Sequence, residues 1–165
     1  MEPTEPRDQE QAEAAQGVGA RTARTQAQVR AFISLLVAAD ELQREVDGLL
    51  KTADLTSSQY NVLRILRGGE PDGLRCGDVI ARLIKRDPDV TRLMDRLERR
   101  GLITRGRDPQ DRRVVRTRIT NTGLALIAGL DEPVDALHEK QFGHIDEGRL
   151  ADLTALIGET LARRP

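Results

Sequence analysis

The sequence predicts a mainly α-helical fold that carries one small β-hairpin, and three observations support this prediction. Aromatic residues make up only 2% of the 165 residues and tryptophan is absent, so the core must be aliphatic. Apolar residues recur at three- and four-residue steps over most of the chain, which is the period of an amphipathic helix. Residues 102–107 and 114–119 instead contain β-branched residues and flank a turn sequence. The length corresponds to about one domain.

The N-terminal half of the chain begins with a polar segment and continues into a long helix. Residues 1–24 are rich in Glu, Gln, Ala and Gly, and we expect a disordered tail there. From Thr25 to about Leu50, apolar residues at helical spacing predict an unusually long helix, and its apolar stripe requires a partner. The stripe consists of Val29, Phe32, Ile33, Leu36, Leu42, Val46, Leu49 and Leu50.

A second helix has clear signals at both ends. Thr56 is expected to be its N-cap, with Gln59 three residues later completing a capping box. Leu55 and Tyr60 stand where a hydrophobic staple would form. The helix is expected to end at Gly68-Gly69, before a polar loop.

Two shorter helices follow. The first is expected over residues 77–84, with Val79, Ile80 and Leu83 facing inward. Asp87 and Pro88 then provide an N-cap and a first helical residue for the next helix. That helix should bury one apolar face and end at Gly101. The face consists of Val90, Leu93, Met94 and Leu97.

The rest of the chain predicts a hairpin and further helices. Strands are expected over residues 102–107 and 114–119, around a turn that contains Asp108-Pro109. Asn121 or Thr122 should cap the following helix, which Pro133 should kink or break. A last helix is expected over residues 146–162.

Positive charge is concentrated on one helix and the hairpin. Residues 85–118 contain 12 Lys/Arg and 6 Asp/Glu, a local net charge of +6, whereas the whole chain has −1. Such asymmetry is typical of a surface that binds a polyanion. The alternative is that the arginines form only a solvated helix face. Single-stranded nucleic-acid binders usually stack bases on aromatic side chains, which are scarce here, so we expect duplex DNA.

Three short helices followed by a hairpin are the components of a winged helix-turn-helix, which we assign to residues 55–120. Such a lobe places its last helix in the major groove and the hairpin beside the backbone or minor groove. Residues 25–54 and 121–165 then form a helical dimerisation region, and residues 1–24 form the tail.

The chain resembles the MarR family (multiple antibiotic resistance regulators) over about residues 28–162. The resemblance rests on the patterns LTSSQYNVLRIL (55–66), VTRLMDRLERRGLITR (90–105) and DPQDRRVVRTRITNTG (108–123), and on the long flanking helices. It implies a homodimeric regulator that binds pseudo-palindromic double-stranded DNA, usually a repressor released by a small molecule or an oxidant. The family often has Ser or Thr where this chain has Asp87-Pro88-Asp89. One carboxylate there could cap the helix while the other accepts from a base amino group.

Eight residues are candidate DNA contacts. Thr91 and Arg92 lie in the first turns of the reading helix, and an arginine can form two hydrogen bonds with guanine. At the hairpin tip, either Arg112 or Arg113 is expected to enter a narrow minor groove, while the other pairs with Asp111 or Asp95. The full candidate set is Arg86, Asp89, Thr91, Arg92, Arg96, Arg107, Arg112 and Arg113.

An effector pocket is expected near Phe32, Leu36, Tyr60 and Leu63. Its aliphatic lining suggests a lipophilic or aromatic carboxylate, a type of ligand that the family resemblance also implies. Cys76 could instead sense peroxide, although a half-buried structural cysteine is the simpler interpretation.

No catalytic, cofactor or metal site is expected. His138 and His144 are only two of the three or four ligands that a zinc site needs. The single cysteine and an acidic start without an apolar run predict a cytoplasmic protein without a membrane anchor. The alternative functions are a ligand-binding protein without DNA binding and a purely structural helical dimer. The basic hairpin argues against both.

Overall fold

The computed structural model describes residues 6–69, 72–84, 89–108 and 111–162. The chain divides into two compact units, residues 1–43 and 44–165. The described residues of the first unit belong to helix α1 (Pro6–Lys51), which continues into the second unit. The helical fold with a small sheet agrees with the predicted fold class.

Helix α1 begins earlier than predicted. Residues 6–24 are helical, so the expected disordered tail is wrong for the part of it that the structure describes. The segment is rich in Ala, Glu, Gln and Arg, which have high intrinsic helix propensity. A helix satisfies its backbone hydrogen bonds locally, so the lack of large apolar residues did not exclude one here.

Helix α2 (Ser57–Arg67) follows its predicted capping signals. The Thr56 hydroxyl accepts a hydrogen bond from the Gln59 backbone N–H at 3.2 Å, and Gln59 Oε1 accepts one from the Thr56 N–H at 2.9 Å. Leu55 and Tyr60 are both buried. The helix ends at Gly68, as expected.

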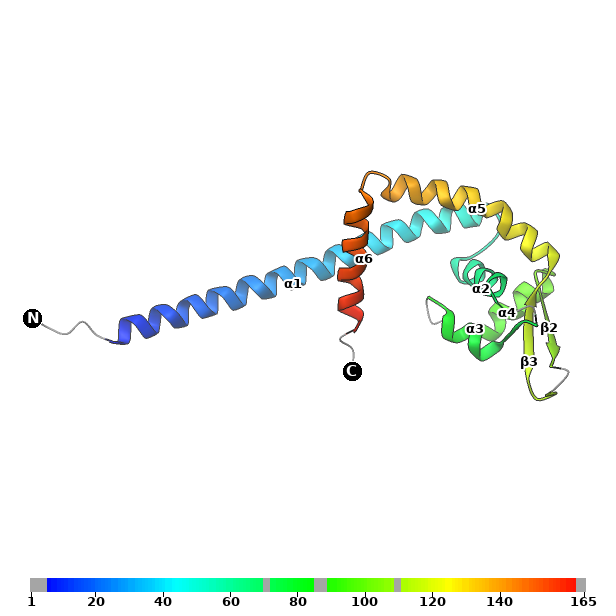
Figure 1. Ribbon diagram of the computed structural model, residues 1–165, viewed down its shortest axis with the longest axis horizontal. Helices are drawn as coiled ribbons and strands as arrows, with labels where there is room; N and C mark the ends of the chain where they lie inside the picture. Colours follow the sequence, from blue (N-terminus) through cyan, green and yellow to red (C-terminus); the bar gives the residue numbers. More distant parts are fainter. Residues whose placement is uncertain (1–5, 70–71, 85–88, 109–110, 163–165) are drawn as a thin grey trace, which may run out of the picture. The chain divides into compact units, whose positions relative to one another are not determined.

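A three-stranded antiparallel sheet has the order β1–β3–β2 (Leu74–Arg75, Val115–Ile119 and Ile103–Arg107). The hairpin strands agree with the prediction to within one residue, with Ile103 opposite Ile119 and Arg107 opposite Val115. Strand β1 was not predicted, because two residues are too few to show a periodicity. Figure 1 shows the sheet beside helices α2, α3 (Cys76–Arg82) and α4 (Val90–Arg99).

The core of the second unit lies among these elements. The apolar face predicted for α4 is buried throughout, and Val79 of α3 is also fully buried. Ile80 is 42% exposed, so its predicted inward position is wrong. The seven-residue helix α3 is only about two turns long and buries only Val79, with Leu83 just beyond its end partly buried.

Helix α5 (Asn121–Phe142) departs from the prediction at its N-cap, and of the kink or break expected at Pro133 the structure excludes the break. Its N-cap is Thr120, whose hydroxyl accepts a hydrogen bond from the Gly123 N–H at 3.0 Å, so neither Asn121 nor Thr122 is the cap. Pro133 lies inside the helix without breaking it. Proline removes only one backbone donor, and the neighbouring Leu130 and Val134 are buried in the core.

Helix α6 (Glu147–Ala162) has no buried residue. It begins one residue after the predicted start and ends where predicted. Among the helices of the described residues, none is long and apolar enough to cross a lipid bilayer.

Candidate nucleic-acid interface

Helix α4 has one apolar face and one polar face. Val90, Leu93, Met94 and Leu97 are buried at spacings of three and four residues. Thr91, Arg92 and Arg96 lie on the opposite face and are exposed. The apolar face therefore fixes the rotation of the helix, and it leaves a threonine and two arginines available to a ligand.

The N-terminus of α4 is capped by Asp89, not by the expected Asp87. Asp89 Oδ1 accepts a hydrogen bond from the Arg92 N–H at 3.3 Å, and Asp89 Oδ2 lies 3.1 Å from Arg92 Nε. A carboxylate is favourable at this position because it compensates the positive end of the helix dipole. Asp87, Pro88 and the candidate contact Arg86 lie outside the described residues.

Arg105 of strand β2 links α4 to the hairpin through ion pairs. Arg105 Nη2 lies 2.5 Å from Asp95 Oδ1 and 2.5 Å from Glu98 Oε2, and the Arg105 backbone N–H donates to Glu98 Oε1 at 3.1 Å. The side-chain hydrogen bond with Glu98 raises the pKa of Arg105 and lowers that of Glu98. The contact therefore sets the position of the helix relative to the strand.

The sequence interpretation missed this arrangement. It assigned Asp95 or Asp111 as the partner of a hairpin-tip arginine, Arg112 or Arg113. The structure places Arg105 beside Asp95 instead, so the Asp95 alternative is wrong. The available signal was the spacing of Asp95 and Glu98, which puts two carboxylates on one side of a helix.

A second ion pair supports the turn end of the hairpin. Asp108 is buried and pairs with Arg116 Nε, while Arg116 Nη1 donates to the Gly73 carbonyl at 3.0 Å. Arg116 therefore joins strand β3 to both the hairpin turn and the segment before β1. Nothing local in the sequence distinguishes Arg116 from its neighbours, so this role could not be predicted.

The three hairpin arginines of the candidate set are exposed. Arg107 Nη1 donates to the Arg112 carbonyl at 3.4 Å, which links the two sides of the hairpin. The Arg113 backbone N–H donates to Asp111 Oδ1 at 3.0 Å. The side chains of Arg107, Arg112 and Arg113 thus present positive charge at the end of the sheet. Which tip arginine would enter a groove stays a prediction.

The four residues expected to line an effector pocket differ in exposure. On α1, Phe32 is 61% exposed and Leu36 is 55% exposed. In the second unit, Tyr60 and Leu63 are buried in the core. Cys76 is half-buried at the start of α3. His138 Nδ1 lies 3.1 Å from Gln141 Oε1.

Comparisons with known proteins agree with the resemblance seen in the sequence. The family model described as MarR family matches residues 53–114. The crystal structure of a MarR transcription factor from Planctomyces limnophilus is 38% identical, with a TM-score of 0.62, and the match covers 78% of this chain and 93% of that one.

Two further relatives extend the comparison. The S. aureus MepR–DNA complex is 25% identical, with a TM-score of 0.71 and coverage of 79% of this chain and 95% of that one. The HTH-type transcriptional repressor IacR of Pseudomonas putida is 25% identical over 114 residues, which are 69% of this chain and 67% of the relative.

Proposed function

The chain belongs to the MarR family of transcription regulators, and from this premise we propose how it binds operator DNA. It acts as a homodimer whose two α4 helices enter successive major grooves of a pseudo-palindromic site. The observation that carries this proposal is the two-faced α4, because its core-packed side orients Thr91, Arg92 and Arg96 outward. Arginine at such a position can form two hydrogen bonds with guanine.

The hairpin supports the same function. Exposed Arg107, Arg112 and Arg113 would contact the phosphate backbone or a narrow minor groove beside the helix. Arg86 belongs to the proposed contact set on sequence grounds, and Asp89 contributes by capping α4 and pairing with Arg92. MepR, which has the same fold, has been solved in complex with DNA.

Exposed apolar side chains support the homodimer. Helix α6 buries none of its residues, and α1 is exposed over much of its apolar stripe. Large exposed apolar surfaces of this kind mark sites of association. The residues are Val29, Phe32, Ile33 and Leu36 on α1 and Leu153, Leu156, Ile157 and Leu161 on α6.

The proposed outcome is repression, relieved by an effector. IacR is named a transcriptional repressor. A lipophilic or aromatic carboxylate effector would release DNA only if it binds the DNA-free form more tightly. We propose no catalytic activity and a cytoplasmic location, since the family consists of regulators that act on DNA.

Footprinting tests the proposal directly. Genomic fragments selected by the purified protein should share an inverted repeat, with half-sites about 10–10.5 bp apart and protection on one face of the duplex. Replacing Arg112 and Arg113 together by Ala should weaken binding to operator and random DNA alike and flatten its salt dependence. A single asymmetric site, or no enrichment of any sequence, would contradict the proposal.

A further inference from the structure

Helix α5 connects the winged lobe to α6, and its first turn is attached to the lobe by backbone contacts. The Thr120 hydroxyl donates to the Gly101 carbonyl at 2.7 Å, and the Thr120 N–H donates to the Leu102 carbonyl at 3.0 Å. Gly123 lies so close to the same segment that a Cβ atom there would come within 2.3 Å of the Leu102 carbonyl oxygen. The start of α5 is therefore held against the turn between α4 and β2.

A second polar attachment lies farther along α5. Asp131 is eight residues after Gly123, about 12 Å along the helix at 1.5 Å per residue. Arg67, in the last turn of α2, places Nη1 2.9 Å from Asp131 Oδ1 and 2.7 Å from Asp131 Oδ2. This hydrogen-bonded contact raises the pKa of Arg67 and lowers the pKa of Asp131. It joins two helices that are far apart in the sequence.

Apolar packing holds α5 on the lobe but does not by itself fix its direction. Ile127, Leu130 and Val134 are buried in the core, while residues 135–142 are all exposed or half-buried. Hydrophobic burial is non-directional, whereas a charge-assisted hydrogen bond has a defined geometry. Asp131 lies beside the last buried residues of α5, so its bond with Arg67 acts where it has the most control over the direction of the helix.

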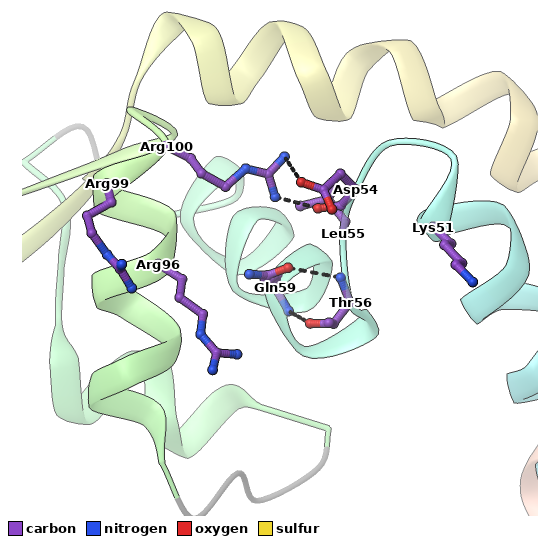
Figure 2. A pocket seen from close by; sticks show the side chains of 8 residues that line it. All are labelled: Lys51, Asp54, Leu55, Thr56, Gln59, Arg96, Arg99 and Arg100. Carbon is purple, nitrogen blue, oxygen red and sulfur yellow. Dashed lines mark hydrogen bonds and ion pairs between the residues drawn. The ribbon is translucent and has the colours of Figure 1, made fainter.

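At its other end, α2 is joined to the reading helix α4. Arg100, the C-cap of α4, donates to the backbone carbonyls of Asp54 and Ala53 in the turn before α2, and its Nη2 lies 3.7 Å from Asp54 Oδ2. Figure 2 shows this arginine reaching from the end of α4 to the turn. Polar contacts at the two ends of α2 therefore connect α5 to α4.

We propose that Arg67 and Asp131 are positioning residues for operator binding, because their ion pair fixes the direction of α5 and thereby the place of α4 relative to α6. This role rests on the proposed function, in which α6 contributes to the dimer and both α4 helices must meet half-sites of fixed spacing. Helix α5 has 22 residues and is about 33 Å long, so a rotation of about 5° about its first turn moves its far end by about 3 Å, close to the rise of one base pair.

Loss of the ion pair should reduce operator affinity without unfolding the lobe. The Arg67 and Asp131 side chains are 33% and 46% exposed, and ion pairs this exposed contribute little to stability. Without the pair, each lobe samples other directions, and the apparent affinity for DNA falls with the fraction of molecules that match the half-site spacing. A duplex with a single half-site imposes no spacing, so binding to it should not change.

Fluorescence anisotropy of the intact protein on three duplexes tests this role. The duplexes are the operator selected by the protein, the operator with one half-site replaced by random sequence, and the operator with one base pair added between the half-sites. Asp131→Asn removes the carboxylate charge, and Glu132→Gln is the matched control at the next residue of α5. Arg67→Glu brings like charges together, and combining it with Asp131→Arg restores the pair with reversed polarity.

We expect Asp131→Asn to weaken operator binding about threefold per protomer, and so about tenfold for the dimer. Binding to the duplex with one half-site should stay within about twofold of the wild type, and the preference for the original spacing should decrease. Arg67→Glu should behave like Asp131→Asn, the reversed pair should recover most of the affinity, and Glu132→Gln should match the wild type. The proposal is overturned by an unchanged operator affinity, by equal losses on the operator and the single half-site, or by a reversed pair that binds no better than Arg67→Glu.

Pulsed electron paramagnetic resonance tests the position of the lobe without DNA. Nitroxide labels on Ala81→Cys in α3 and Ala155→Cys in α6 occupy exposed positions, and the background substitution is Cys76→Ser. Dilution with unlabelled protein restricts the measured distance to one protomer. Asp131→Asn should broaden the distance distribution and Glu132→Gln should not, and an unchanged distribution for Asp131→Asn would contradict the proposed role. A wild type that binds no operator would refute the proposed function, and the distance distribution would still decide whether the ion pair positions the lobe.

Discussion

Helices α4 and α6 both carry regularly spaced apolar residues, but those of α4 are buried and those of α6 are not. On α4, Val90, Leu93, Met94 and Leu97 are all at most 8% exposed. On α6, Leu156 and Leu161 are about 60% exposed, and no residue of the helix is buried. Helix α4 is also tied to β2 by ion pairs, whereas α6 has none among the described residues.

This difference distinguishes the apolar surface that one chain buries in its own core from the apolar surface that stays exposed and is available to a partner. The apolar side of α4 contributes to the folding of the second unit, and its burial orients the arginines on the other side. The apolar side of α6 contributes nothing to that core. Its burial free energy is therefore available for association.

The strongest test of the comparison is Leu97→Ala. Leu97 is fully buried, so the truncation should cost about 2–5 kcal/mol in the free energy of unfolding, measured by urea denaturation. The control is Ile84→Ala, since Ile84 is 84% exposed and its truncation should change stability by less than about 0.5 kcal/mol. Equal effects of the two substitutions would show that α4 does not pack as described.

The equivalent truncation on α6, Leu156→Ala, should act on association. Removing three carbon atoms from a dimer interface costs about 2 kcal/mol per protomer, at about 0.8 kcal/mol per methylene group. Because both protomers lose it, analytical ultracentrifugation should show a dimer dissociation constant raised by about a thousandfold, while Ile84→Ala leaves it unchanged. An unaltered dissociation constant would place the interface elsewhere.

The polar face of α4 is tested by Arg92→Ala. If Arg92 binds guanine, the loss should be about 1–3 kcal/mol per half-site on the operator and much smaller on random DNA. Fluorescence anisotropy on both DNAs measures this difference, with Arg149→Ala as the control for a lost positive charge. Equal losses on the two DNAs would show that Arg92 contacts only phosphate.

The sequence predicted the elements whose signals are local. The capping box of Thr56 and Gln59, the apolar side of α4 and the two hairpin strands each depend on a few adjacent residues, and each was confirmed. Local signals also misled. Three neighbouring residues, Thr120 to Thr122, can all cap a helix. Strand β3 ends at Ile119, and Thr120, the next residue, is the N-cap.

Features that depend on distant contacts could not be predicted. Strand β1 exists because Leu74 and Arg75 pair with Thr117 and Arg116, more than 40 residues away. Arg105 and Arg116 are two among many arginines in the sequence, and only the fold brings them to carboxylates. The candidate contacts of α4 could be predicted because burial of one helix face determines the other.

The smallest expected effect concerns the polar attachment of α4. The Arg105 guanidinium holds the pKa of Glu98 below its usual range, so the pKa is lower in the folded than in the unfolded protein. A group of this kind contributes stability above its unfolded pKa, and the contribution is lost as the pH falls through the folded pKa. Glu98→Gln should therefore be less stable than the wild type at pH 7, and the difference should vanish in acid.

The Glu98 side chain is 37% exposed, so solvent screening keeps the effect small. Thermal unfolding from pH 7 to pH 3 measures it, with Glu132→Gln on α5 as the control for one lost negative charge. A difference that persists in acid would mean that the Glu98 carboxylate does not stabilise α4 through its charge.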